Sequence, residues 1–103
     1  MDIIVHAHHA VLSDTLRGRA ERTLLRLAAR VRRPVDATIR FAQDGPLRRV
    51  EIELRPARRR PLIAAGQSRQ FGPALADAAG RMATQLGRVK RTRKSRAPET
   101  LRA

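Results

Sequence analysis

The chain contains no cysteine, tryptophan or tyrosine and only two phenylalanines among its 103 residues. Without cysteine it can form neither a disulfide nor a thiolate metal site. With so few aromatic rings, the core has to be built from Leu, Ile, Val and Ala. Sheet-based RNA readers stack bases on exposed aromatic side chains. That mode of binding is therefore nearly excluded, because Phe41 and Phe71 both fall on predicted core faces.

Long hydrophobic runs are also missing. No apolar segment approaches the roughly 20 residues that a membrane-spanning helix needs. Residues 1–6 lack the basic and long apolar regions of a signal peptide, so we expect a cytoplasmic protein. The hydrophobic content of 42% argues against full disorder, and the length suggests about one domain.

Acidic residues are few relative to basic ones. Lys and Arg number 23 against 9 Asp and Glu, which gives a formal net charge of +14. All of these cations except Lys90 and Lys94 are arginines, whose planar fork of donors suits phosphate. A GC-rich genome would also favour Arg codons, but it would not explain the excess of positive charge. Such an excess indicates a polyanionic partner, with nucleic acid as first candidate and anionic membrane as second.

Hydrophobic periodicity predicts a strand at 2–8 and a helix at 14–30. Ser13 is suited to cap the start of the helix, and Pro34 to stop the chain from continuing it. The predicted core stripe of this helix comprises Leu16, Ala20, Leu24, Leu27 and Val31.

The middle of the chain predicts an antiparallel hairpin with one buried face. Its two alternating apolar sets are separated by turn residues at 43–46. They comprise Val35, Ala37, Ile39 and Phe41, then Val50, Ile52 and Leu54.

A short fourth strand at about 62–66 and a long helix at 72–91, fraying toward 94, complete the prediction. Pro73 is compatible with this helix because it falls in the first turn. The helix carries one apolar stripe, made of Phe71, Leu75, Ala78, Ala79, Met82, Leu86 and Val89.

The predicted order is β-α-β-β-β-α, which favours a two-layer α+β sandwich. In this arrangement two helices cover one face of a four-stranded sheet. We expect a single domain over 1–94, followed by a disordered basic tail at 95–103.

Charge is unevenly distributed over these elements. The solvent face of the hairpin is neutral, because its three basic and three acidic residues alternate across the strands: Asp36, Arg40, Arg49, Glu51, Glu53 and Arg55. The first helix carries arginines three or four residues apart on one outward face: Arg19, Arg22, Arg26 and Arg30. The end of the second helix is basic without any acid: Arg88, Lys90, Arg91, Arg93, Lys94 and Arg96.

A single surface arginine is most often merely solvated, but two adjacent basic ridges beside a neutral sheet favour phosphate binding. Such binding reads shape and falls steeply with salt.

Catalytic and metal chemistry find little support. His6 and His8 share a strand face, but no cysteine or placed carboxylate completes a zinc site with them and His9. Glu51 and Glu53 are flanked by arginines, as in paired surface charge. A basic amphipathic helix can also lie on a membrane, but the second helix lacks large aromatic anchors. We therefore expect no enzyme activity, cofactor, metal, small-molecule substrate or membrane partner.

The ordered set of segments resembles the short form of the ribosome hibernation promoting factors, also called ribosome-associated inhibitors or sigma-54 modulation proteins. The resemblance spans residues 1 to about 96. Its N-terminal part is Asp2-Ile3-Ile4-Val5-His6-Ala7, Leu12-Ser13, Leu16-Arg17 and Leu24 to Leu27. Its C-terminal part is Ala65-Gly66-Gln67, Ala74-Leu75 and the run from Arg81 to Lys90. The segment 68–73 departs from the family, which usually has an acid and a Tyr at a tighter start of this helix.

The resemblance implies a fold similar to a double-stranded-RNA-binding domain. It also implies a partner, the small ribosomal subunit, whose decoding channel the protein would occlude through rRNA phosphates. The family's ribosome-facing positions would fall on Arg17, Arg26, Arg81, Arg88, Lys90 and Lys94. Thr23 and Thr84 stand where the family often has cations, and the nearby Arg22, Arg91 and Arg93 would compensate for those two lost contacts. Arg30 is added to the candidate RNA contacts because it lies on the basic face of the first helix. We expect a monomer when free, without the dimerisation domain of the long form.

Three other functions stay open from the sequence. The chain could be a general binder of structured RNA or DNA, which bulk duplex would displace from ribosomes. It could be a structural or assembly component of the ribosome, present at constant stoichiometry, whereas a hibernation factor varies with growth phase. A metal-dependent enzyme built on His6 and His8 is the most distant alternative.

Overall fold

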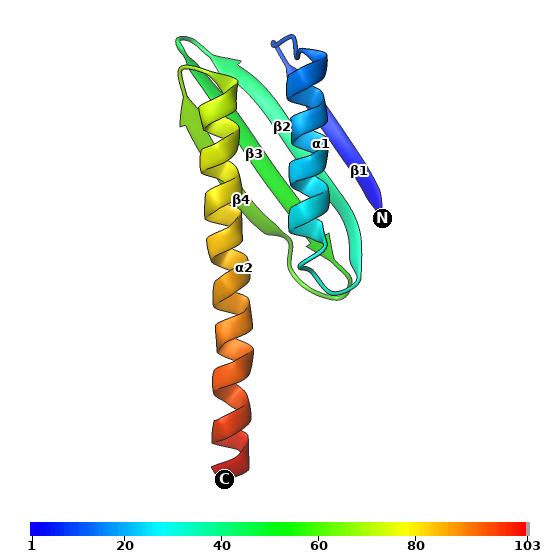
Figure 1. The fold of residues 1–103 in the computed structure, drawn as a ribbon, viewed down its shortest axis with the longest axis vertical. Coiled ribbons are helices and arrows are strands. Elements are labelled where there is room, and N and C mark those ends of the chain that lie inside the picture. Colours follow the sequence, from blue (N-terminus) through cyan, green and yellow to red (C-terminus); the bar gives the residue numbers. More distant parts are fainter. Residues whose placement is uncertain (103) are drawn as a thin grey trace.

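The computed structural model describes the backbone of residues 1–102 and the side chains of residues 1–88. Its elements are β1 (Asp2–His8), α1 (Asp14–Ala28), β2 (Pro34–Asp44), β3 (Leu47–Pro56), β4 (Leu62–Ser68) and α2 (Phe71–Arg102). The strands form one sheet in the order β1-β2-β3-β4. β1 pairs with β2 in parallel, and the other two pairs are antiparallel. Both helices lie side by side on the same face of this sheet (Figure 1). The predicted order and two-layer α+β architecture are therefore confirmed.

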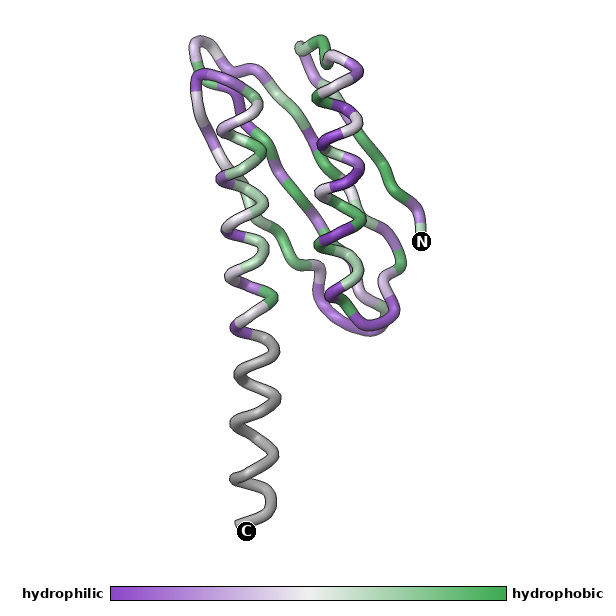
Figure 2. Tube along the Cα trace, in the orientation of Figure 1, coloured by the Kyte–Doolittle hydropathy of each residue, from purple (hydrophilic) through white to green (hydrophobic). Residues whose placement is uncertain are grey.

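The core forms where the helices meet the sheet. Phe41, Ile39 and Ile52 are fully buried on the sheet side, and Leu24 and Met82 face them from the two helices. The apolar stripes predicted for the two helices thus pack into or against the core over the residues whose side chains are described. Hydrophobic and hydrophilic residues alternate along β2 and β3, whereas the loop between β3 and β4 is hydrophilic (Figure 2).

Local signals explain where α1 begins and ends. The hydroxyl oxygen of Ser13 accepts a hydrogen bond from the backbone N–H of Leu16 at 3.1 Å, as predicted for an N-cap. The helix ends at Ala28, two residues before the predicted end at 30. Tighter turns follow the helix, in which the N–H groups of Arg30 and Val31 donate to the carbonyl oxygens three residues back. Arg30 therefore follows the helix instead of lying within it.

Several predicted boundaries need correction. β2 continues to Asp44, so the hairpin turn narrows to Gly45 and Pro46, and Gly45 takes a φ of +61° that suits glycine. Val35 was expected on the buried face but is 48% exposed, because the β2–β3 register is irregular between Pro34 and Asp36. β4 extends to Ser68, past the predicted end at 66.

The start of α2 is fixed by aromatic packing. Phe71 meets the buried Phe41 edge to face, with ring centroids 5.4 Å apart. The guanidinium of Arg48 lies 5.4 Å from the centroid of the Phe71 ring. α2 accordingly begins at Phe71, one residue before the predicted start, and its backbone stays helical to Arg102, past the predicted end at 91. The division into a domain at 1–94 and a disordered tail at 95–103 stays a prediction.

Candidate nucleic-acid interface

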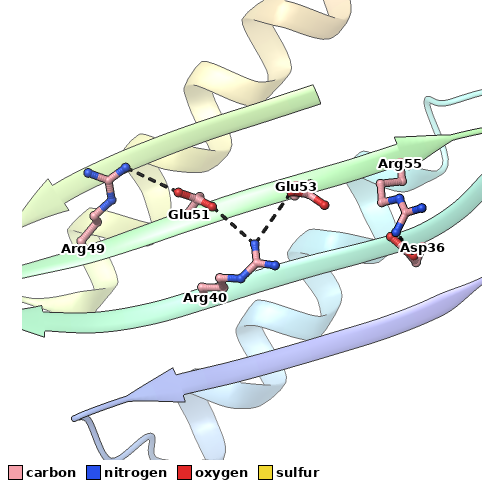
Figure 3. A network of polar contacts seen from close by, with 6 residues as sticks. All are labelled: Asp36, Arg40, Arg49, Glu51, Glu53 and Arg55. Atoms are coloured by element: carbon pink, nitrogen blue, oxygen red, sulfur yellow. Dashed lines mark hydrogen bonds and ion pairs between the residues drawn. The ribbon is translucent and has the colours of Figure 1, made fainter. Parts of the chain in front are cut away.

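The outer face of the sheet neutralises its own charges, as the alternation predicts. The guanidinium of Arg40 lies between two carboxylates of β3, 3.4 Å from that of Glu51 and 3.9 Å from that of Glu53 (Figure 3). Glu51 also pairs with Arg49 at 3.5 Å. On the neighbouring stretch, Arg55 pairs with Asp36 at 3.3 Å. Most cations on this face are therefore already paired with carboxylates, and few are left to bind a polyanion.

The arginines of α1 are placed differently. Together with α2 they line a groove with a volume of about 510 Å³. One wall carries the basic side chains, and the other is formed mostly by small residues of α2. Its lining residues are Arg19, Arg22, Thr23, Arg26, Leu27, Arg30, Leu75, Ala76, Ala79, Gly80 and Ala83. Among the residues whose side chains are described, no Asp or Glu lines this groove.

None of these groove arginines forms a salt bridge with any side chain of residues 1–88. The predicted candidates Arg22, Arg26 and Arg30 are thus brought together. Arg19 joins them: its guanidinium reaches to within 3.4 Å of the position that a Cβ on Gly72 would take. The spacing of the arginines placed Arg19 on this ridge, but it was not among the candidate contacts. Only the position of α2 shows that it shares the groove.

Arg17 is exposed but does not line the groove. Thr23, one of the two positions where the resemblance left a contact in doubt, is buried. Its hydroxyl donates to the backbone carbonyl of Arg19 at 2.8 Å. Since its hydroxyl is satisfied within the helix, Thr23 acts as a core residue.

Two further candidates lie on the opposite flank of α2. Arg81 and Arg88 line a separate hollow of about 420 Å³ between α2 and β4, together with Thr84 and Gln85. Arg81 is already paired with Asp77, one turn earlier, at 3.1 Å. The hydroxyl of Thr84 donates to the carbonyl of Gly80 at 3.0 Å. The candidate residues therefore divide between two surfaces, which the sequence did not distinguish.

Four candidates, Lys90, Arg91, Arg93 and Lys94, lie on the helical backbone of α2 beyond Arg88. Their side chains lie outside the described residues, so their part in any interface stays a prediction.

The histidines do not gather into a recognisable metal site. Within the described part of the chain, no group of three or more His, Cys, Asp or Glu side chains is placed to hold a metal ion. The rings of His8 and His9 meet edge to face, with centroids 4.1 Å apart. His6 pairs in register with Arg40 on the sheet. Among the described residues, no helix is long and apolar enough to span a membrane.

Comparisons with known proteins point in one direction. A family model described as "Sigma 54 modulation protein / S30EA ribosomal protein" matches residues 3–94. A ribosomal subunit interface protein from Coxiella burnetii has a similar fold, with a TM-score of 0.74, 18% identity, and coverage of 87% of this chain and 98% of the other. The N-terminal domain of Protein Y from Thermus thermophilus matches with a TM-score of 0.72, 22% identity, and coverage of 86% and 99%. No curated protein gives a significant sequence match.

Proposed function

Because this chain belongs to the sigma 54 modulation protein / S30EA ribosomal protein family, whose members are ribosome-associated, we propose that it binds the small ribosomal subunit and silences translation. The protein would occupy the decoding channel, where mRNA and tRNA otherwise bind. It acts as a cytoplasmic binding protein and catalyses no reaction. The related structure from Coxiella burnetii is described as a ribosomal subunit interface protein, which supports a binding site between the subunits.

One contrast carries this proposal: the arginines on the outer face of the sheet are paired with carboxylates, whereas the arginines that line the groove between the helices are not paired with any carboxylate of residues 1–88. Arg40, Arg49 and Arg55 on the outer face of the sheet form ion pairs with carboxylates of β2 and β3. The groove arginines have no such partners among the described side chains. When the groove faces rRNA, each of these arginines would neutralise one phosphate and release one condensed counterion. The helical layer is therefore the surface that faces the ribosome.

The kind of recognition follows from the side chains present. Neither phenylalanine is available for base stacking, because Phe41 is buried and Phe71 packs against it. Phosphate contacts position a protein on nucleic acid but carry no sequence information. The protein would therefore recognise the arrangement of phosphates around the channel. The sheet serves as a stiff support that holds the two helices at a fixed spacing.

Inhibition of translation then requires only that the protein occupies the decoding channel. A folded domain seated in the channel excludes mRNA and tRNA by volume. Since the attraction is largely electrostatic, the protein would leave the subunit when salt is raised. We further propose that it accumulates in stationary phase and under stress, as a hibernation factor would.

Sedimentation of the purified protein with small subunits on sucrose gradients tests the proposal. At low salt the protein should travel with the subunit, and at high salt it should stay at the top of the gradient. Absence from the small-subunit fraction at low salt would refute the proposal. An excess of bulk duplex RNA serves as a competitor, because displacement at equal nucleotide concentration would indicate a general duplex binder.

A further inference from the structure

The groove between α1 and α2 has a shape and a charge pattern that suit one particular form of nucleic acid. We propose that it is a seat for a single extended phosphodiester strand, such as unpaired RNA. This inference rests on the proposed RNA-binding function and adds which conformation of RNA the groove takes.

The first argument is the linear array of cations. Arg19, Arg22, Arg26 and Arg30 follow one another at intervals of three or four residues. The two intervals within α1, from Arg19 to Arg22 and on to Arg26, correspond to rises of about 4.5–6 Å along the helix, and Arg30 follows two residues past its end. This repeat is comparable to the distance between successive phosphates of an extended strand. A row of guanidinium groups at this repeat can therefore contact consecutive phosphates, since each offers its own fork of donors.

The second argument is that the row faces a hollow. The wall opposite the arginines is formed by Ala76, Ala79, Gly80 and Ala83 of α2. The resulting space of about 510 Å³ can take the sugar-phosphate chain of a few nucleotides. A nucleic-acid duplex is wider than a single strand by a second strand and its base pairs, so we expect it to rest on the rim of the groove.

The third argument concerns competition within the protein. Among the side chains of residues 1–88, no carboxylate lines the groove, whereas Asp77, paired with Arg81, lines a further hollow on the other flank of α2. The free protein therefore has no acidic side chain that a strand would need to displace from this groove. If the four arginines each neutralise one phosphate, the logarithm of the binding constant should fall with the logarithm of salt concentration with a slope of about −3.

Two glycines of α2 allow a test that leaves charge unchanged. Gly80 lines the groove and Gly87 does not, and a Cβ at either position would meet no atom within 4 Å. Gly80→Leu fills the groove, and Gly87→Leu is its matched control. Both substitutions should favour the helix, because glycine is a poor helix former. Ala76→Leu, at a second exposed position lining the groove, provides an independent block.

The measurement is fluorescence anisotropy with a labelled oligouridine of about ten nucleotides, at fixed salt, with folding verified by circular dichroism. We expect Gly80→Leu and Ala76→Leu to weaken binding by about tenfold, and Gly87→Leu to bind like the unmodified protein. Equal affinities for Gly80→Leu and Gly87→Leu would overturn the inference. So would failure of the unmodified protein to bind the oligomer, or a duplex of equal length that binds as tightly and loses as much on Gly80→Leu.

Sedimentation of the same variants separates this inference from the proposed function. If the unmodified protein travels with the small subunit but the groove block leaves oligomer binding intact, the groove inference alone fails. If the unmodified protein never travels with the small subunit, the proposed function itself fails.

Discussion

Gly66 on β4 lies so close to Ala78 on α2 that a Cβ on Gly66 would be 2.6 Å from the backbone nitrogen of Ala78. The carbonyl oxygen of Ala74 crowds the same position. Because these atoms belong to the helix backbone, they cannot yield as the end of a flexible side chain would. This contact lets α2 settle directly on the edge strand and holds the second wall of the groove in place.

Gly66→Ala should therefore destabilise the protein by about 1–3 kcal/mol, the usual cost of overpacking. The melting temperature should fall by about 5–20 °C, as measured by circular dichroism. Gly80→Ala is the control, because a Cβ there meets open space and the helix gains about 1 kcal/mol. Equal melting temperatures for Gly66→Ala and the unmodified protein would show that β4 and α2 can separate without cost.

Removing the same amount of charge from the two faces should have different effects on ribosome binding. Arg22→Gln with Arg26→Gln takes two cations from the groove, and Arg40→Gln with Arg49→Gln takes two from the ion-paired sheet face. We expect the groove variant to lose small-subunit affinity by about tenfold or more and the sheet variant to keep it. The measurement is the bound fraction on sucrose gradients at low salt. Equal losses would mean that net charge, and not its placement, governs binding.

Asp77 should limit the contribution of Arg81 to RNA affinity. The Arg81 guanidinium donates to the Asp77 carboxylate at 3.1 Å, one turn away on α2. Asp77→Asn frees Arg81, so affinity for structured RNA should rise by about two- to threefold, the scale of an exposed i,i+4 pair. In the background of Arg81→Gln the same substitution should give a smaller gain. A double-mutant cycle measured by anisotropy checks this, and an undiminished gain without Arg81 would place that residue outside the interface.

The N-cap of α1 should contribute measurably to stability. Ser13→Ala removes the acceptor for the Leu16 N–H and should cost about 1 kcal/mol. Thr15→Ala, at an exposed position in the first turn, is the control and should change stability little. Urea denaturation followed by circular dichroism measures both. A Ser13→Ala midpoint equal to that of Thr15→Ala would show that the cap is dispensable.

The amino-acid sequence by itself determined the elements and the faces they bury. Helical spacing placed Leu24 and Met82 in the core, and strand alternation placed Ile39 and Ile52 opposite them. The neutral sheet face was also predictable, because pairing across a hairpin follows from local register. Val35 was misplaced, since the register irregularity beside it leaves no mark in the hydrophobic pattern.

The tertiary structure alone decided how the basic residues are divided. By sequence, Arg26 and Arg81 are both exposed cations on amphipathic helices, yet Arg26 lines the groove between α1 and α2, whereas Arg81 lies on the far flank of α2. That division depends on how α1 and α2 settle on the sheet, and therefore on contacts such as Gly66 against Ala78 between distant parts of the chain. Periodicity reports which side of a helix is buried, but it does not report which neighbour lies beside the exposed side.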